Sequence, residues 1–354
     1  MRIVSVTSVR DEGPFLLEWI AWHRLLGVSD FLIFSNDCRD GTDRMLDALA
    51  TAGVVEHLPH GRQAGKSIQW QALKSAWQHP LRKAADWMLI SDLDEFPMIH
   101  AGAHRFADLL AALPEGTEAV ALAWRLFGNA GIAGFADRPV TAQFLHSAPA
   151  EMLHPIAASY FKTLFRPAAF RQPGVHRPAP VAGRVPVWVD GSGRPLPASH
   201  AENDGILALW RLTNYRHLAE LHHYSLRSLE SFLVKTERGL PNRGSKNLDL
   251  QYWVERNYNA TPNAAALALQ VPLAEEMARL RALPGLAVLH DAACTWHQQK
   301  AQALLRQPES YRLYAACQHV PASAVLPASM AINLLRLRHA IQTSGQVEAD
   351  PRPA

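Results

Sequence analysis

Trp87-Met88-Leu89-Ile90-Ser91-Asp92-Leu93-Asp94-Glu95 is the stretch of sequence that decides the fold. Its apolar residues are typical of a buried strand, and acidic residues follow where that strand ends. Because side chains alternate along an extended chain, we expect Asp92 and Asp94 to point the same way. Two such carboxylates suit Mg²⁺ or Mn²⁺, ions that keep positions open for nucleotide phosphates. The alternative is that acidic residues merely end a strand before a turn.

Strand-like and helix-like patterns alternate before this stretch. Pro14 fits the first position of one helix and Gly27 its C-terminal cap, and Thr42 fits the N-cap of a second helix that Gly53 closes. The predicted strands are residues 2–9, 31–35 and 54–58, and the predicted helices are residues 14–26, 42–52 and 67–78. This order predicts an α/β fold with a doubly wound, mostly parallel sheet and right-handed crossovers.

Polar clusters follow the predicted strands, and the carboxyl ends of parallel strands open on one edge of a sheet. The clusters are Arg10-Asp11-Glu12, Asn36-Asp37 with Asp40-Gly41-Thr42, residues 59–66 and residues 92–95. Arg62 and Lys66 precede or open a helix, where a cation is disfavoured by about 0.3–1 kcal/mol. A bound diphosphate would offset that cost. Two solvated loop cations are an equally good interpretation.

These runs resemble family-2-like glycosyltransferases that carry a D-x-D-E-F signature on a glycosyltransferase A-type fold. The most specific parts are residues 17–28, Asp40-Gly41-Thr42 and residues 92–96, within a similarity over roughly the first two thirds of the chain. The resemblance implies transfer of a hexose from a nucleotide sugar, most readily a UDP-sugar, to a glycan or lipid-linked acceptor. It also implies inversion at the anomeric carbon and a cofactor, Mn²⁺ or Mg²⁺, that bridges protein and diphosphate.

The same resemblance implies roles for particular residues. Asp92 and Asp94 match the metal and ribose residues of the D-x-D motif. Asp37 lies where such enzymes contact the base, and Lys66 falls near the diphosphate. The other matches are Arg10 and Glu12 in the nucleotide-pocket loop, residues 124–128 on the acceptor side, and His223 of His222-His223-Tyr224 as a metal ligand. A core histidine is the alternative interpretation of His223.

An inverting transfer needs a base that takes the proton from the acceptor hydroxyl. Residues 129–201 are irregular and rich in Pro and Gly, as acceptor-binding loops are, although an ordinary surface excursion looks the same. Within them, His176 accepts a proton near neutral pH without a large pKa shift, and we choose it as the base. Asp137 is the second candidate, and a structural role in the loop is the alternative.

The chain length allows one large domain with a helical addition. We expect a catalytic domain over residues 1–225, a helical region over 226–346 and a disordered tail over 347–354. The 35 Lys and Arg residues nearly balance the 32 Asp and Glu residues, which argues against nucleic acid as a partner.

Location is inferred from cysteines and from the beginning of the chain. Cys38, Cys294 and Cys317 show no C-x-x-C spacing and leave one unpaired, which favours a reducing compartment. A first strand starting at Arg2 leaves no room for a signal peptide, so we expect a cytoplasmic protein. The basic helical residues 334–338 are compatible with peripheral contact at the inner face of a membrane, although a solvated helix face is the simpler interpretation.

Two other functions fit parts of the sequence. Gly61-Arg62-Gln63-Ala64-Gly65-Lys66-Ser67 resembles the phosphate-binding loop of an NTPase, but it has three residues between its glycines where that motif has four. A non-catalytic sugar-binding protein on the same fold is the other possibility. Loss of the metal carboxylates would be its sign, and both carboxylates are present.

Overall fold

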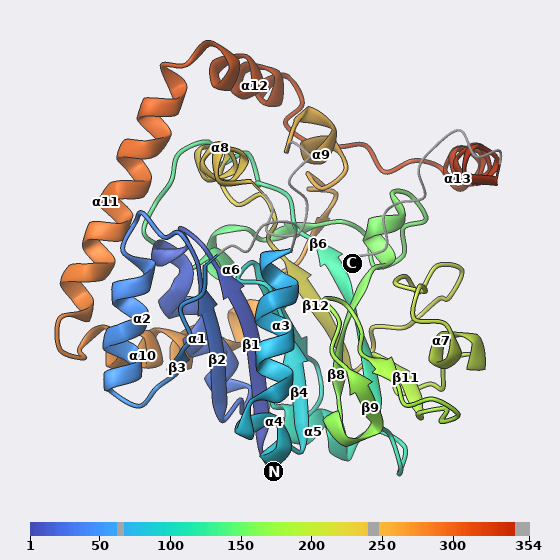
Figure 1. Ribbon diagram of the computed structural model, residues 1–354. Helices are drawn as coiled ribbons and strands as arrows, with labels where there is room; N and C mark the ends of the chain where they lie inside the picture. The colour runs from blue at the N-terminus through green and yellow to red at the C-terminus, as the bar shows by residue number, and fades with distance from the viewer. Residues whose placement is uncertain (62–66, 240–247, 344–354) are drawn as a thin grey trace.

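The computed structural model describes residues 1–61, 67–239 and 248–343. Among these residues, a nine-stranded mixed sheet forms the centre, with helices on both faces (Figure 1). In sheet order its strands are β3 (Glu56–His57), β2 (Asp30–Ser35), β1 (Ile3–Val9), β4 (Trp87–Ile90), β8 (Phe161–Phe165), β6 (Ala119–Leu126), β12 (Ala219–His223) and β5 (Glu95–Ile99), with β11 (Trp188–Asp190) beside β6.

Most neighbouring strands run parallel. β1 pairs in parallel with β2 and β4, β2 with β3, and β6 with β11 and β12. β8 runs antiparallel to β4 and β6, as β5 does to β12. The order β3-β2-β1-β4 reverses its direction of growth between β1 and β4, and ligands of α/β sheets bind outside the carboxyl ends of the strands at such a reversal.

Alternate residues of the strands face two separate hydrophobic cores. Phe31 and Leu89 face the core that contains α1 (Gly13–Leu25) and α2 (Thr42–Thr51). Leu32 and Ile90 face the opposite core, which contains α3 (Ile68–Gln78). Helices therefore cover both faces, and the predicted fold class, a doubly wound and mostly parallel α/β sheet with a C-terminal helical region, is confirmed.

The C-terminal helices share a core with the sheet. α10 (Gln270–Arg281) and α11 (Leu286–Leu305) pack against α1, and Leu273, Leu286 and Ala293 belong to the same core as its apolar residues. At Gly13 a Cβ would lie 2.7 Å from the Cβ of Ala293, so only glycine permits this approach. The predicted division between residues 225 and 226 stays a prediction, and the predicted tail, 347–354, lies outside the described residues.

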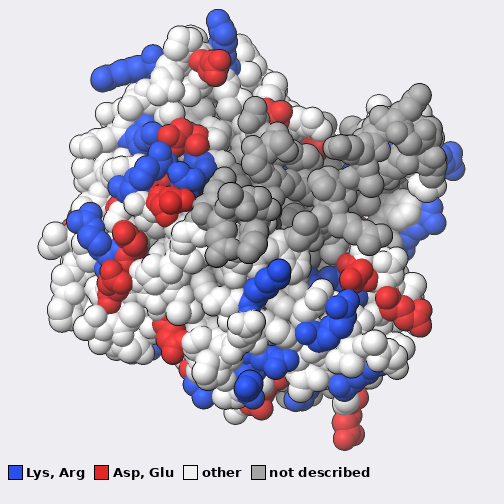
Figure 2. Space-filling view, viewed as in Figure 1, with Lys and Arg blue, Asp and Glu red and all other residues white. Residues whose placement is uncertain are grey.

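The remaining elements surround this centre. The other helices are α4 (Pro80–Ala84), α5 (Phe106–Ala111), α6 (Val140–Gln143), α7 (Ala198–Glu202), α8 (Leu229–Arg238), α9 (Leu250–Val254), α12 (Pro308–His319) and α13 (Ala328–Thr343). Two small antiparallel sheets pair β9 (Phe170–Gln172) with β10 (Ala179–Pro180) and β7 (His146–Ser147) with β13 (Thr261–Pro262). On the face shown in Figure 2, basic and acidic side chains of the described residues are interspersed.

Helix starts differ in detail from the predictions. Thr42, predicted as the N-cap of α2, is instead its first helical residue, and the N-cap is Gly41, with φ at 88°. The hydroxyl of Thr42 instead donates to Asp40 over 2.6 Å and accepts from the Glu12 N–H over 3.0 Å. Asp40-Gly41-Thr42 therefore joins the loop after β2 to the loop after β1. The third strand, β3, is shorter than the predicted residues 54–58.

Candidate active site

Asp92 and Asp94 lie in the turn that joins β4 to β5. The N–H of Glu95 donates to the carbonyl oxygen of Asp92 over 3.0 Å, so the chain is folded back here. We expected an extended chain that aligns the two carboxylates by alternation. The predicted conformation is wrong, because a turn begins at Leu93. Each of the two carboxylates has a different cation as its partner.

The partner of Asp92 is Lys162, a lysine of β8 with no exposed side-chain surface. Its Nζ lies 3.1 Å from Oδ2 of Asp92 and 3.5 Å from Oε2 of Glu95. Gln69 donates to Oδ1 of Asp92 over 3.1 Å, and the indole N–H of Trp124 donates to Oε1 of Glu95 over 2.7 Å. The turn is therefore held from both sides by buried donors.

Burial and charge act in opposite directions on this group. Burial raises the pKa of Glu95 to about 8, against the lowering effect of Lys162. Burial would lower the pKa of Lys162, but the carboxylates of Asp92 and Glu95 outweigh it and raise that pKa. Lys162 is therefore a permanent positive charge beneath the turn.

The partner of Asp94 is Lys235, a residue of α8. The Nζ of Lys235 lies 2.7 Å from Oδ2 of Asp94, and Nε2 of His223 lies 3.6 Å from Oδ1. Although burial raises the pKa of Asp94, Lys235 and His223 hold it well below its usual range. The neighbouring His222 has a different partner, with its Nε2 3.1 Å from Oε1 of Glu220.

Asp94 and His223 could hold a divalent cation between them. Oδ1 of Asp94 and Nε2 of His223 face each other, and Asp92 belongs to the same turn. Nδ1 of His223 is buried without a hydrogen-bond partner among the described residues, so the ring has capacity that the protein does not use. An ion held by one or two carboxylates and completed by a diphosphate matches the chemistry of Mg²⁺ and Mn²⁺. Lys235 neutralises Asp94 when no such ion is bound.

The loop after β1 is tied to this turn through α8. Arg227 and Arg238 reach the two carboxylate oxygens of Glu12 at 2.7 and 2.5 Å, and Arg227 also donates to the carbonyl oxygen of Leu93 over 3.1 Å. Burial raises the pKa of Glu12, but the two guanidinium groups outweigh it and lower that pKa. Arg10 donates to the carbonyl oxygen of Arg238 over 3.4 Å. Glu12 and Arg10 thus connect the loop after β1 to α8.

Asp37 borders a cavity of about 330 Å³ at the carboxyl ends of β2 and β3. Small-molecule sites have volumes of about 300–1,000 Å³, so the space suits a nucleoside. The cavity is lined by Ser35, Asn36, Asp37, Cys38, Asp43, Asp47, His57, Pro59, His60 and Gly61. Lys66, the predicted diphosphate contact, lies outside the described residues. Ser67, which follows it, caps α3 by accepting the N–H of Trp70 over 3.4 Å.

His176 lies next to the turn. Its ring centroid is 5.5 Å from that of Trp124, which also holds Glu95, and its Nδ1 donates to the carbonyl oxygen of Phe161 over 3.1 Å. A carbonyl oxygen only accepts, so the neutral ring carries its proton on Nδ1 and leaves Nε2 as the acceptor. Burial and the nearby Lys162 lower the pKa of His176 to about 3. Our expectation of a nearly normal pKa is therefore wrong.

Asp137 has a different environment. Its Oδ1 lies 3.0 Å from Nε2 of His290, and its Oδ2 lies 3.5 Å from Nη1 of Arg281. None of its hydrogen bonds or ion pairs within the described ranges joins it to the turn at residues 92–95. The structure thus separates the surroundings of the two candidate bases, and both roles stay predictions.

Four cations of the site were not predicted from the sequence, and of these Lys162 and Arg227 are buried whereas Lys235 and Arg238 are partly buried. Lys162 is the only charged residue of the apolar run 160–165, and this was the available signal, because a charge inside a buried strand needs a partner. Arg227 lies just before α8, and Lys235 and Arg238 lie on it, so the direction of these side chains depends on how α8 packs. No local pattern gives that information.

Together, a doubly wound sheet, an acidic turn at its switch point and a cavity beside it define an α/β protein whose ligand site lies at the carboxyl edge. Residues 3–187, just over half of the 354-residue chain, match the model of glycosyltransferase family 92. The chain belongs to this family. The family-2-like and D-x-D-E-F assignments stay predictions.

Relatives in plants carry the same family name. The chain is 28% identical over 93 residues to a glycosyltransferase family 92 protein of Ricinus communis, which is 25% of this chain and 16% of that protein. A family 92 protein of Oryza sativa subsp. japonica is also 28% identical over 93 residues, or 25% of this chain and 15% of that protein. The chain therefore spans about a sixth of the length of these relatives.

Two solved structures show more distant similarity. The mannosyltransferase PcManGT from Pyrobaculum calidifontis, in complex with GDP-Man and Mn²⁺, is 13% identical, with 96% of this chain and 80% of that chain covered and a TM-score of 0.34. Glucosyl-3-phosphoglycerate synthase from Mycobacterium tuberculosis, in complex with Mn²⁺, UDP and glucosyl-3-phosphoglycerate, is 16% identical, with 35% and 44% covered and a TM-score of 0.24.

Proposed function

We propose that this protein transfers a hexose from a nucleotide sugar, a UDP-sugar first of all, to a glycan or lipid-linked acceptor with inversion at the anomeric carbon. The observation that carries the proposal is the turn at the switch point of the sheet. There Asp94 and His223 face each other, and Asp92 has one oxygen beside a buried lysine. Family 92 membership supports a glycosyltransferase over an NTPase or a non-catalytic sugar-binding protein.

In this proposal the donor lies along the carboxyl edge. The cavity beside Asp37 binds the nucleobase of the donor, and the diphosphate extends from there toward Asp92 and Asp94. Mn²⁺ or Mg²⁺, held by Asp94, His223 and Asp92, would stabilise the negative charge of the departing diphosphate. Lys235, which pairs with Asp94 when no ion is bound, is then free to contact the diphosphate.

His176 is the proposed base on the acceptor side. As the acceptor oxygen bonds to the anomeric carbon, the bond from that carbon to the diphosphate breaks, and Nε2 of His176 takes the hydroxyl proton. Burial is the largest cause of the low pKa of His176, and the nearby Lys162 lowers that pKa further; the negative charge of the diphosphate would offset the effect of Lys162. The base is therefore stronger with the donor in place than without it.

Ligand-dependent melting tests this function. A panel of UDP- and GDP-sugars and free UDP, each with and without Mn²⁺, is compared with ATP and Mg²⁺. We expect a nucleotide sugar to raise the melting temperature only with the divalent ion. Tight, hydrolysable ATP binding without nucleotide-sugar binding would support the NTPase instead.

We further propose that α13 contacts an anionic membrane surface, where a lipid-linked acceptor would be found. No helix of the described residues is long and apolar enough to cross a bilayer. An exposed apolar stripe runs along α13, and it consists of Met330, Leu334, Leu337 and Ile341, which are 56%, 40%, 53% and 42% exposed. Arg336 and Arg338 add positive charge to the same helix, a combination typical of interfacial helices.

A further inference from the structure

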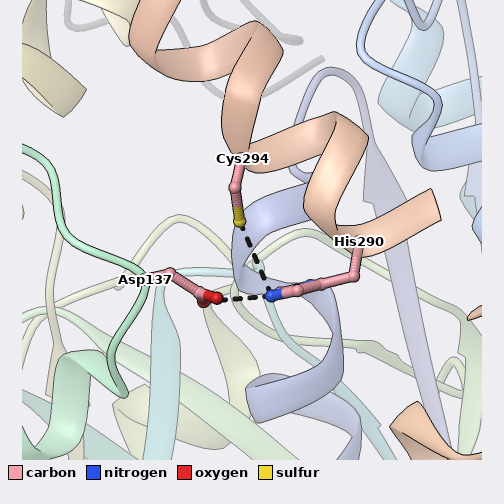
Figure 3. A group of neighbouring side chains, drawn as sticks. All are labelled: Asp137, His290 and Cys294. Carbon is pink, nitrogen blue, oxygen red and sulfur yellow. Dashed lines mark hydrogen bonds and ion pairs between the residues drawn. The ribbon is translucent and has the colours of Figure 1, made fainter. Parts of the chain in front are cut away.

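A second group of metal-ligating side chains lies away from the acidic turn. His290 and Cys294 are one turn apart on α11, and Asp137 reaches them from the loop between β6 and α6 (Figure 3). One ligand atom of each lies within 4.8 Å of the others. His290 and Cys294 are buried, and the side chain of Asp137 is 40% exposed, so the group is shielded by protein on one side and accessible on the other.

Both partners of His290 approach the same ring nitrogen. Nε2 lies 3.0 Å from Oδ1 of Asp137 and 3.5 Å from Sγ of Cys294. In a nucleophilic relay, the acid and the thiol would use different nitrogens of the imidazole. Convergence of sulfur, nitrogen and oxygen on one region is the arrangement of ligands around a common ion.

Two of the three separations, those from Nε2 of His290, are close to those of a tetrahedral zinc site. Zn–S bonds of about 2.3 Å and Zn–N bonds of about 2.0–2.1 Å place tetrahedral S and N ligands about 3.6 Å apart, and N and O ligands about 3.3 Å apart. The observed distances from Nε2 of His290 are 3.5 Å to Cys294 and 3.0 Å to Asp137. Small movements of exposed Asp137 would centre an ion among the three atoms.

Charge and surroundings also suit zinc. A thiolate and a carboxylate neutralise Zn²⁺, and a sulfur, nitrogen and oxygen donor set favours zinc over the hard ions Mg²⁺ and Mn²⁺. Arg281 contacts Oδ2 of Asp137 at 3.5 Å and also pairs with Asp291, so it orients the carboxylate and leaves Oδ1 for the ion. Such support of a ligand by an outer partner is typical of metal sites.

We propose that Asp137, His290 and Cys294 bind one Zn²⁺, with water in the fourth position. The ion joins the loop after β6 to α11, the helix whose Ala293 packs against Gly13 at the start of α1. The site therefore fixes α11 to the loop after β6 and acts as a structural clamp. It gives Asp137 a role that is independent of sugar transfer.

Cobalt substitution tests the site directly. Untagged protein is treated with a chelator under reducing conditions and titrated with Co²⁺, whose bond to a thiolate gives a charge-transfer absorption. We expect this absorption to reach its maximum at one equivalent of Co²⁺ and to disappear when Zn²⁺ is added. Cys294→Ser should abolish it. Cys317→Ser, which alters another buried free cysteine, should leave it unchanged.

Further variants separate this ion from the one at the acidic turn. Asp94→Asn should retain the cobalt–thiolate absorption, whereas Asp137→Asn should weaken Co²⁺ binding. Zn²⁺ should raise the melting temperature of the parent but not that of Cys294→Ser. A parent protein without the absorption, or a Cys294→Ser variant that keeps it, would overturn the site. Binding of zinc without any change in melting would overturn the clamp.

Discussion

Lys162 and Asp92 form an ion pair between a buried lysine and a partly exposed aspartate. The lysine side chain has no exposed surface, its Nζ lies 3.1 Å from Oδ2 of Asp92, and the aspartate side chain is 38% exposed. One oxygen of Asp92 is thus neutralised from inside, while the carboxylate still reaches solvent. A buried positive charge beneath an accessible carboxylate fixes the direction of the turn at residues 92–95.

Replacing Lys162 by Met should destabilise the fold. Glu95 would lose the cation 3.5 Å from its Oε2 and keep its buried position, and breaking a buried pair costs about 3–5 kcal/mol. Denaturant unfolding at about pH 9 measures the change, because Glu95, whose pKa burial raises to about 8, is ionised there. The control is Lys300→Met, because its pair with Glu237 is partly exposed and should contribute less than about 1 kcal/mol. Equal losses in the two variants would contradict the role of Lys162.

Replacing His176 by Ala should separate binding from transfer. Mn²⁺ and UDP should bind as tightly as in the parent, because no proposed ligand is removed. Transfer should fall by about 10²–10⁴-fold with the loss of a general base. The exposed His217, replaced by Ala, is the control. Parental transfer by His176→Ala would eliminate it as the base.

His23 should make the fold sensitive to acid. Its side chain is fully buried, and burial lowers its pKa to about 3, below the value near 6.5 of an unfolded chain. The unfolded state therefore binds more protons, so the contribution of His23 to stability is complete above about pH 6.5 and is lost as the pH falls toward about 3. Between about pH 7.5 and about 5.5, the loss is about 1.4 kcal/mol.

His23→Phe keeps an aromatic ring beside Trp19 but cannot bind a proton. The free energy of unfolding of this variant should therefore fall by about 1.4 kcal/mol less than that of the parent over the same pH interval. Denaturant unfolding at both pH values gives the comparison. The same pH slope in the two proteins would show that His23 is not the source.

The apolar stripe of α13 should direct the protein to anionic vesicles. We expect sedimentation with vesicles that contain anionic lipid and much less with purely zwitterionic vesicles. Leu334→Glu combined with Leu337→Glu should abolish binding. Val271→Glu, at an apolar position of α10 that is 73% exposed, should not. If the double variant still binds anionic vesicles, a surface other than α13 makes the membrane contact.

Much of the sheet was predictable because local signals agree with its topology. β4 is a short apolar run, β1 consists of Ile, Val, Ser and Thr, and Gly27 and Gly53, with positive φ, follow the helices as predicted. Prediction failed where a tertiary contact determines the hydrogen-bond partner of a side chain. Thr42 was expected to cap its own helix, but its hydroxyl is engaged by Asp40 and by the N–H of Glu12.

The site was predictable only where chemistry follows directly from the local sequence. Asp92 and Asp94 stood out because acidic residues follow an apolar strand. Their partners Lys162 and Lys235 come from β8 and α8, 70 and 141 residues further along the chain, so the sequence does not reveal the pairing. The low pKa of His176 has the same cause, since it depends on burial and on Lys162.

The most direct test of the proposed function is release of nucleoside diphosphate from a panel of nucleotide sugars with Mn²⁺, by the parent and by Asp94→Ala. Slow hydrolysis needs no known acceptor, so it reports on the donor site alone. We predict that the parent releases the diphosphate from one class of donor, that a chelator stops the reaction, and that Asp94→Ala keeps its fold but loses the activity. Hydrolysis by Asp94→Ala at the parental rate, with or without Mn²⁺, would contradict the account.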